Sequence, residues 1–231
     1  EIRDSMDFMD REMSGTMDLR VRIEADVKDP RILNGLDSLQ SFVQENENIS
    51  VTYSIADVVK QMHRAVMDDS LKYESIPPTR EKVNNLFTMY YMSGDYDGLS
   101  SMIDPDHKTT LITSLSSIMS TEDIFSLVES MTTYIDKHFF GTEKINITGM
   151  IVVIRDMVLM VIRSALLSIA ISVLLIGLIT SLFFGRVIWG ALSIIPLFSA
   201  VILNFGLMGH FDIALNHITA ILSSIIIGVG V

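Results

Sequence analysis

The chain has 231 residues, no cysteine and a formal net charge of −11. Without cysteine it can form no disulfide, no thiolate nucleophile and no Cys-type zinc site. The acidic balance leaves no basic surface to replace counterions on phosphates, which argues against nucleic-acid binding. From residue 164 to the end the only ionised side chains are Arg186 and Asp212, so the sequence divides into an acidic, polar part and an apolar part.

The polar part begins with a strand–helix–strand pattern. A short amphipathic helix over residues 2–13 is expected first. Residues 18–27 then alternate between charged and apolar side chains, which predicts a strand with one solvated face. Asp29 and Pro30 are suited to cap and open a helix, and alternation resumes over residues 49–55. The apolar stripe of the predicted central helix is Ile32, Leu36, Leu39 and Val43.

The same pattern returns later in the chain. Residues 107–117 are rich in Thr, Leu and Ile and predict a strand. Ser120 or Thr121 would cap the helix that follows, and Gly141 would end it. A last short strand is expected over residues 145–147.

Two further helices are predicted between these units, over residues 56–67 and 79–91. Two strand–helix–strand units in tandem are typical of a ferredoxin-like α+β sandwich. The predicted fold class is therefore α+β, with a ferredoxin-like domain over residues 1–150 and a transmembrane helical segment over residues 151–231.

The apolar part contains three runs of membrane length, over about 164–185, 187–209 and 213–231. At about 1.5 Å per residue the first reaches roughly 33 Å, enough to cross a hydrocarbon core of about 30 Å. The connections between the runs are too short for anything but antiparallel hairpins. Because the chain starts at Glu1 without Met, and the third run reaches Val231 without a polar flank, we expect a fragment of a longer protein.

Small and irregular residues interrupt the apolar runs. Small side chains at four-residue spacing let helix backbones approach closely in lipid. The first run contains two such rows: Ser164, Ser168 and Ser172, and then Gly177, Ser181 and Gly185. Pro196 is expected to kink the second span and free a carbonyl. The other candidates for helix-packing or hinge positions are Asn204, Gly228 and Gly230. We interpret these residues as packing devices, with hinges of moving helices as the alternative.

No motif supports an enzyme, and no cofactor is expected. No Asp, Glu, Lys or Arg lies at mid-membrane depth within these runs. The single histidines are expected at surfaces or interfaces; they are His63, His107 and His138. Three polar residues lie around the connection between the second and third apolar runs: His210, Asp212 and His217. We expect them to cap helix ends and not to bind a metal.

The end of the third run, ITAILSSIIIGVGV, resembles the fourth helix of each half of the resistance–nodulation–division exporters. The mycobacterial-membrane-protein-large-like predicted exporters are the most similar branch. In this family a GxGV run, matched here by residues 228–231, is followed directly by an Asp-Tyr pair whose Asp is the proton-relay carboxylate. Residues 194–209 are similar to the preceding helix, and residues 27–43 and 54–66 resemble the porter domain of the second half.

The resemblance implies part of a proton-driven exporter of hydrophobic or lipid-like molecules, taken from its C-terminal half. It places the protein in the inner membrane as a multi-pass protein. The soluble domain would be periplasmic or extracellular, Arg186 would face the cytoplasm, and the relay carboxylate would come directly after Val231. The expected partners are the bilayer, the remaining helices and second porter domain of the same polypeptide, and the substrate; a homo-oligomer is also compatible.

Two other classes of protein stay open at this point. One is a membrane sensor or receptor with an extracellular ligand-binding domain. The other is a protein-translocation subunit of related architecture, whose soluble domain would grip a polypeptide.

Overall fold

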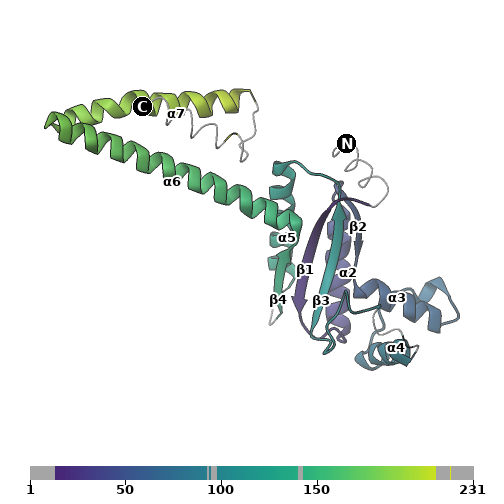
Figure 1. The fold of residues 1–231 in the computed structure, drawn as a ribbon. Helices are drawn as coiled ribbons and strands as arrows, with labels where there is room; N and C mark the ends of the chain where they lie inside the picture. Colours follow the sequence, from purple (N-terminus) through teal and green to yellow (C-terminus); the bar gives the residue numbers. More distant parts are fainter. Residues whose placement is uncertain (1–13, 93, 95–97, 140–142, 212–218, 220–231) are drawn as a thin grey trace. The chain divides into compact units, whose positions relative to one another are not determined.

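The computed structural model describes residues 14–92, 94, 98–139, 143–211 and 219. The chain divides into two compact units, Glu1–Val153 and Ile154–Val231. The first unit is α+β with one four-stranded antiparallel sheet, and two long apolar helices follow it (Figure 1). The predicted α+β class is confirmed at this level. The helix predicted over residues 2–13 lies outside the described residues, as does the third predicted span except for residue 219.

The sheet interleaves the two predicted strand–helix–strand units. Its strands are β1 (Met17–Glu24), β2 (Ile49–Tyr53), β3 (Thr109–Ser116) and β4 (Lys144–Thr148), in the order β2-β3-β1-β4. All three neighbouring pairs are antiparallel. Consequently β1 and β2 run parallel to each other with β3 between them, and β3 and β4 run parallel with β1 between them.

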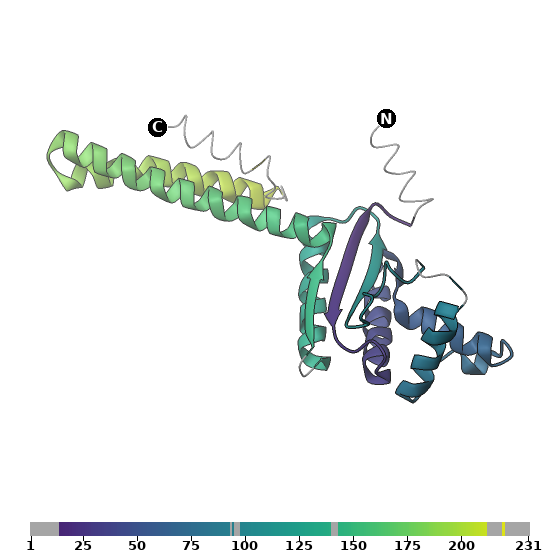
Figure 2. The same cartoon turned by 60° about the horizontal axis from the view of Figure 1, so that its bottom comes forward.

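Helices α2 (Pro30–Gln44) and α5 (Thr121–His138) lie on the same face of the sheet (Figures 1 and 2). Asp29 caps α2 as predicted, because its Oδ1 accepts a hydrogen bond of 2.9 Å from the Arg31 backbone N–H. The predicted apolar stripe of α2 is buried against the sheet. On the strand side, alternate residues of β1 complete the core: Met17, Leu19, Val21 and Ile23.

The two inserted helices are α3 (Ile55–Val66) and α4 (Arg80–Met92), with a short 3-10 turn, η1 (Leu71–Tyr73), between them. Ser54, which is fully buried, caps α3. Its Oγ accepts from the Ala56 N–H at 3.1 Å and donates to Gln40 Oε1 at 2.7 Å. The Ser54 N–H in turn donates to Asp57 Oδ2 at 3.2 Å. This capping box therefore joins α3 to α2 through a buried polar network.

We expect Ser54→Ala to destabilise the protein more than Ser120→Ala. Loss of an N-cap costs about 0.5–2 kcal/mol, and at Ser54 the change also removes the donor to Gln40 inside the protein. Ser120 caps α5 at the surface, where water replaces the lost bonds. Thermal unfolding of both variants checks this expectation, and equal losses would contradict it.

Two boundaries differ from those that the sequence predicts. The first apolar helix, α6 (Met150–Phe184), begins well before the predicted span at residue 164, because the charges up to Arg163 mark the limit of the apolar run and not of the helix. Strand β3 begins at Thr109, so His107 lies in the preceding loop and not in the strand. The second apolar helix, α7 (Val187–His210), agrees with its prediction to within one residue.

Candidate functional site: an apolar hairpin and a cavity

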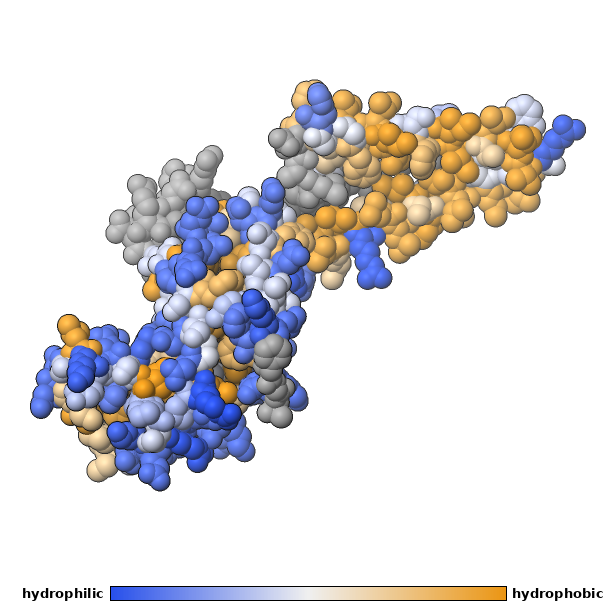
Figure 3. Space-filling view, turned by 180° about the vertical axis from the view of Figure 1, so that it is seen from behind, coloured by the Kyte–Doolittle hydropathy of each residue, from blue (hydrophilic) through white to orange (hydrophobic). Residues whose placement is uncertain are grey.

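Helices α6 and α7 expose many large apolar side chains, which cover the face seen in Figure 3. Both are long and apolar enough to cross a membrane, and hardly any of their apolar residues is buried. A helix that is hydrophobic all round belongs in a protein core or in lipid, and water-soluble monomers rarely expose apolar patches of this extent. The described residues thus support membrane association through these two helices.

Charged and aromatic residues stand at the ends of the apolar stretches. Arg163 is the last charged residue of α6, and Arg186 is the N-cap of α7. Beside Arg186, the rings of Phe184 and Trp189 have centroids 6.2 Å apart. Tryptophan and arginine are enriched where a helix leaves the hydrocarbon for the headgroups. The turn between the helices therefore has the composition of a membrane interface.

The two helices touch through small residues near this turn. A Cβ atom built on Gly190 would lie 1.9 Å from Ser181 Oγ and 2.3 Å from the Gly177 carbonyl oxygen. One built on Gly177 would lie 2.7 Å from Ile194 Cδ1. The predicted row Gly177–Ser181 therefore lies in the α6–α7 contact. Gly185 differs in role: its φ of +66° turns the chain between the helices.

The other membrane candidates lie further along the chain. Pro196 is exposed, and α7 continues on both sides of it. Asn204 lies two turns further along α7. Gly228 and Gly230 lie outside the described residues, as do Asp212 and His217.

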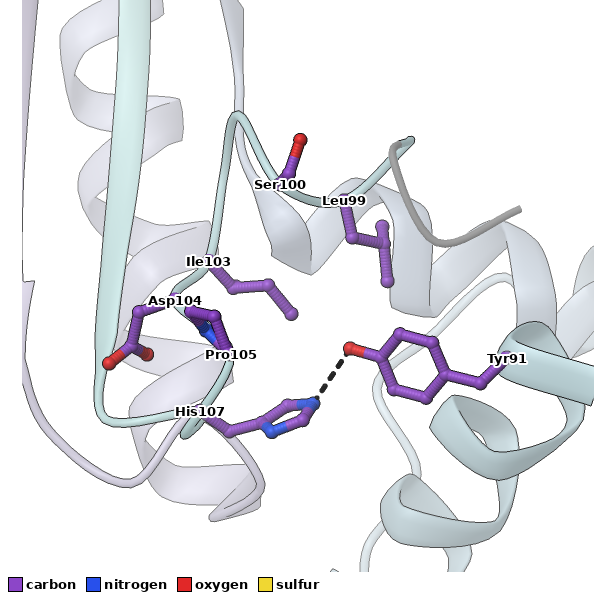
Figure 4. Close-up of a pocket in the computed structure, with 7 residues that line it drawn as sticks. All are labelled: Tyr91, Leu99, Ser100, Ile103, Asp104, Pro105 and His107. Atoms are coloured by element: carbon purple, nitrogen blue, oxygen red, sulfur yellow. Dashed lines mark hydrogen bonds between the residues drawn. The ribbon is translucent and has the colours of Figure 1, made fainter. Parts of the chain in front are cut away.

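The α+β domain contains a cavity of about 670 Å³, which the sequence did not reveal. It lies between α4 and the segment leading to β3, and its lining is Tyr91, Leu99, Ser100, Ile103, Asp104, Pro105 and His107 (Figure 4). Leu99 and Ile103 point into it, whereas the Asp104 carboxylate is turned away. That carboxylate accepts hydrogen bonds from the Lys108 and Thr109 N–H groups at 2.7 and 2.8 Å. The side chains that point into the cavity are therefore apolar, and the polar residues of the described lining besides Asp104 are Ser100 and the Tyr91–His107 pair.

His107 is held in an unusual conformation at this wall. Its φ is +58°, in the left-handed region that non-glycine residues seldom adopt. Its N–H donates to the Asp104 carbonyl at 3.0 Å, and its carbonyl accepts from the Val27 N–H at 3.0 Å. Its Nε2 lies 2.9 Å from the Tyr91 hydroxyl, and the Phe87 ring meets the imidazole edge-on at 5.2 Å. Backbone strain of this kind persists only where the surroundings enforce it.

The Tyr91–His107 pair is neutral at physiological pH. Burial lowers the pKa of His107 and the charge of Lys28 adds to this, against the raising effects of Asp104, Pro105 and Asp26. The effect of Pro105 is a hydrogen bond from the imidazole to its carbonyl. Burial also raises the pKa of the Tyr91 hydroxyl. The cavity thus presents a polar but uncharged pair.

The lowered pKa of His107 predicts a stability that falls in mild acid. A base with a depressed pKa in the folded state binds its proton more tightly when unfolded, so stability rises with pH up to the ordinary histidine value of 6.5 and is lost below it. His107→Asn keeps a residue that tolerates this φ and removes the titration. Urea unfolding against pH should therefore give a shallower acid slope in the variant; identical slopes would show that His107 does not titrate as described.

The remaining histidines take structural positions. His63 was expected at a surface or interface but is only 8% exposed, because it lies on the inner side of α3. Its Nδ1 is 2.7 Å from the Ser75 carbonyl oxygen. His138 stacks on Tyr134, with ring centroids 4.2 Å apart. Within the described ranges, no three His, Cys, Asp or Glu side chains gather as a metal site would require.

Fold and site together define a class, an α+β domain joined to a hairpin of membrane-length helices. No protein-family model and no curated protein sequence matches the chain.

Proposed function

We propose that the chain is part of a proton-driven exporter of hydrophobic or lipid-like molecules, of the resistance–nodulation–division type. In this proposal the α+β domain is a ferredoxin-like porter domain outside the inner membrane, and α6 and α7 belong to the transmembrane bundle. The observation that carries the proposal is the direct join between them: β4 ends at Thr148, and the 35-residue helix α6 begins at Met150.

The sheet order supports the porter assignment. Two strand–helix–strand units that interleave in one antiparallel sheet have the arrangement of a ferredoxin-like sandwich. The first residue of α6 is also tied to the sheet, because the Met150 N–H donates to Asp18 Oδ1 of β1 at 3.1 Å.

The membrane residues have roles in this proposal. A carboxylate following Val231 would be protonated and deprotonated, and each state would favour a different arrangement of the bundle. Pro196 leaves one helix carbonyl without its usual N–H partner, and the close contact at Gly190 lets α6 and α7 slide past each other with little side-chain obstruction. Arg186 would face the cytoplasm.

An efflux assay tests the proposal. Cells producing the complete polypeptide that contains this chain are loaded with the apolar dye Nile red, and its loss is followed with and without a protonophore. We expect efflux that stops when the proton gradient collapses, and that is lost when the acidic residue expected after Val231 is replaced by its amide. Efflux that continues after both treatments would rule out the proposal of a proton-driven exporter.

A membrane sensor is the second candidate, and the cavity beside His107 is the observation that favours it. A receptor needs a ligand site in its soluble domain, and about 670 Å³ is within the usual range for small ligands. Ligand binding by a polypeptide that shows no efflux would support the sensor over the exporter.

A further inference from the structure

We propose that the cavity between α4 and the Leu99–His107 segment binds a small uncharged apolar molecule that carries one hydroxyl group. This site does not depend on transport, since an exporter and a sensor would both accommodate it. The inference comes from the cavity's volume, its lining and the geometry of the Tyr91–His107 pair.

The size and lining of the cavity define the body of the ligand. The cavity's volume of about 670 Å³ is within the usual range for small-ligand sites. The side chains that point into it are Leu99 and Ile103, both nearly fully buried themselves, and the ring of Tyr91 also lines it (Figure 4). Apolar walls favour an apolar body, either a fused aromatic ring system or a short alkyl chain.

The Tyr91–His107 pair defines the polar group of the ligand. The Asp104 carboxylate is turned away and bound to backbone N–H groups, so no charged side chain among the described lining residues faces the interior to balance a charged ligand. A buried charge without a partner is strongly disfavoured. A hydroxyl both donates and accepts, as the tyrosine hydroxyl does, and can join the existing hydrogen-bonded pair.

The pair is also fixed before any ligand arrives. His107 is held by two backbone hydrogen bonds and by the edge contact with Phe87. Its imidazole points toward Tyr91, whose hydroxyl lies 2.9 Å from His107 Nε2 (Figure 4). Groups that are ordered in advance lose little freedom on binding, which favours affinity for a small molecule.

The experiment uses the full chain in lipid nanodiscs, with 2-naphthol and naphthalene as probes and calorimetric or fluorescence titration as the readout. Empty nanodiscs give the partition into lipid, which is subtracted. We expect saturable binding of 2-naphthol, with naphthalene about tenfold weaker because one hydrogen bond is lost. Tyr91→Phe should bind the two probes equally, and Ile103→Trp, which fills the cavity, should bind neither.

Leu71→Trp is the matched control, because Leu71 is 75% exposed and lies outside the cavity lining; it should bind as the unchanged protein does. Far-UV circular dichroism establishes that each variant is folded. If Ile103→Trp does not fold, the relative binding of the two probes to Tyr91→Phe tests the proposal. Signals equal to those of empty nanodiscs, or an undiminished preference for 2-naphthol in Tyr91→Phe, would overturn the proposal.

Discussion

Replacing Gly190 with leucine is expected to force α6 and α7 apart. Even the first side-chain carbon would lie 1.9 Å from Ser181 Oγ and 2.3 Å from the Gly177 carbonyl oxygen, far inside contact distance. The Gly177 oxygen belongs to the helix backbone, so the overlap cannot be relieved by a rotamer change alone. Overpacking costs typically about 1–3 kcal/mol, and here the helices must separate to avoid it.

Gly206→Leu provides the matched control on the same helix, because a Cβ at Gly206 meets nothing within 4 Å. The single tryptophan, Trp189, stands next to Gly190 and reports on the contact. Thermal unfolding in detergent, followed by Trp189 emission, should show a clear loss of stability for Gly190→Leu and little change for Gly206→Leu. Similar behaviour of the two variants would mean that the α6–α7 contact is not as described.

The second large effect is expected from Gly149→Ala, at the join between β4 and α6. Gly149 has a φ of +106°, and an added Cβ would lie 2.6 Å from the Asp18 carbonyl oxygen. The backbone conformation alone costs a non-glycine residue about 1–3 kcal/mol. The overlap adds to this loss of stability, because relieving it displaces the start of β1, where the Asp18 side chain also accepts a hydrogen bond from the Met150 N–H.

Gly94→Ala separates the two causes. Gly94 also has a positive φ, +88°, but a Cβ there meets nothing within 4 Å. We expect Gly94→Ala to show the conformational cost only, and Gly149→Ala to lower the unfolding midpoint further. Far-UV circular dichroism against temperature measures both. Equal losses in the two variants would leave no contribution from the contact with β1.

The regular elements were predictable because each depends on a local pattern. Alternation along β1 and the Asp29–Pro30 start of α2 are set by neighbouring residues. Helix α6 begins before the membrane span predicted from residue 164, because a helix continues through charged residues such as Arg155 and Asp156 that a hydrocarbon core does not accept. Hydropathy locates a membrane boundary but not a helix end.

The candidate site was less predictable. The Gly177–Ser181 row was found from its spacing, but its partner Gly190 lies on another helix, where no spacing rule connects them. The cavity was missed for the same reason. Tyr91 and His107 come from two separate elements, and only the positive φ of His107 brings its imidazole to the tyrosine hydroxyl. The nearest signal in the sequence was the turn-forming run Asp104–Pro105–Asp106 before His107.

The hydrogen bond between Asp18 and Met150 has a consequence for engineering. Because the start of β1 lies beside the point where β4 is followed by α6, the two ends of the described sheet are close together. A module with adjacent termini can be cut out and spliced into a foreign host loop with short spacers. Residues 14–150 are therefore suited to grafting, and a chimera carrying them should retain the sheet without α7 and the rest of α6.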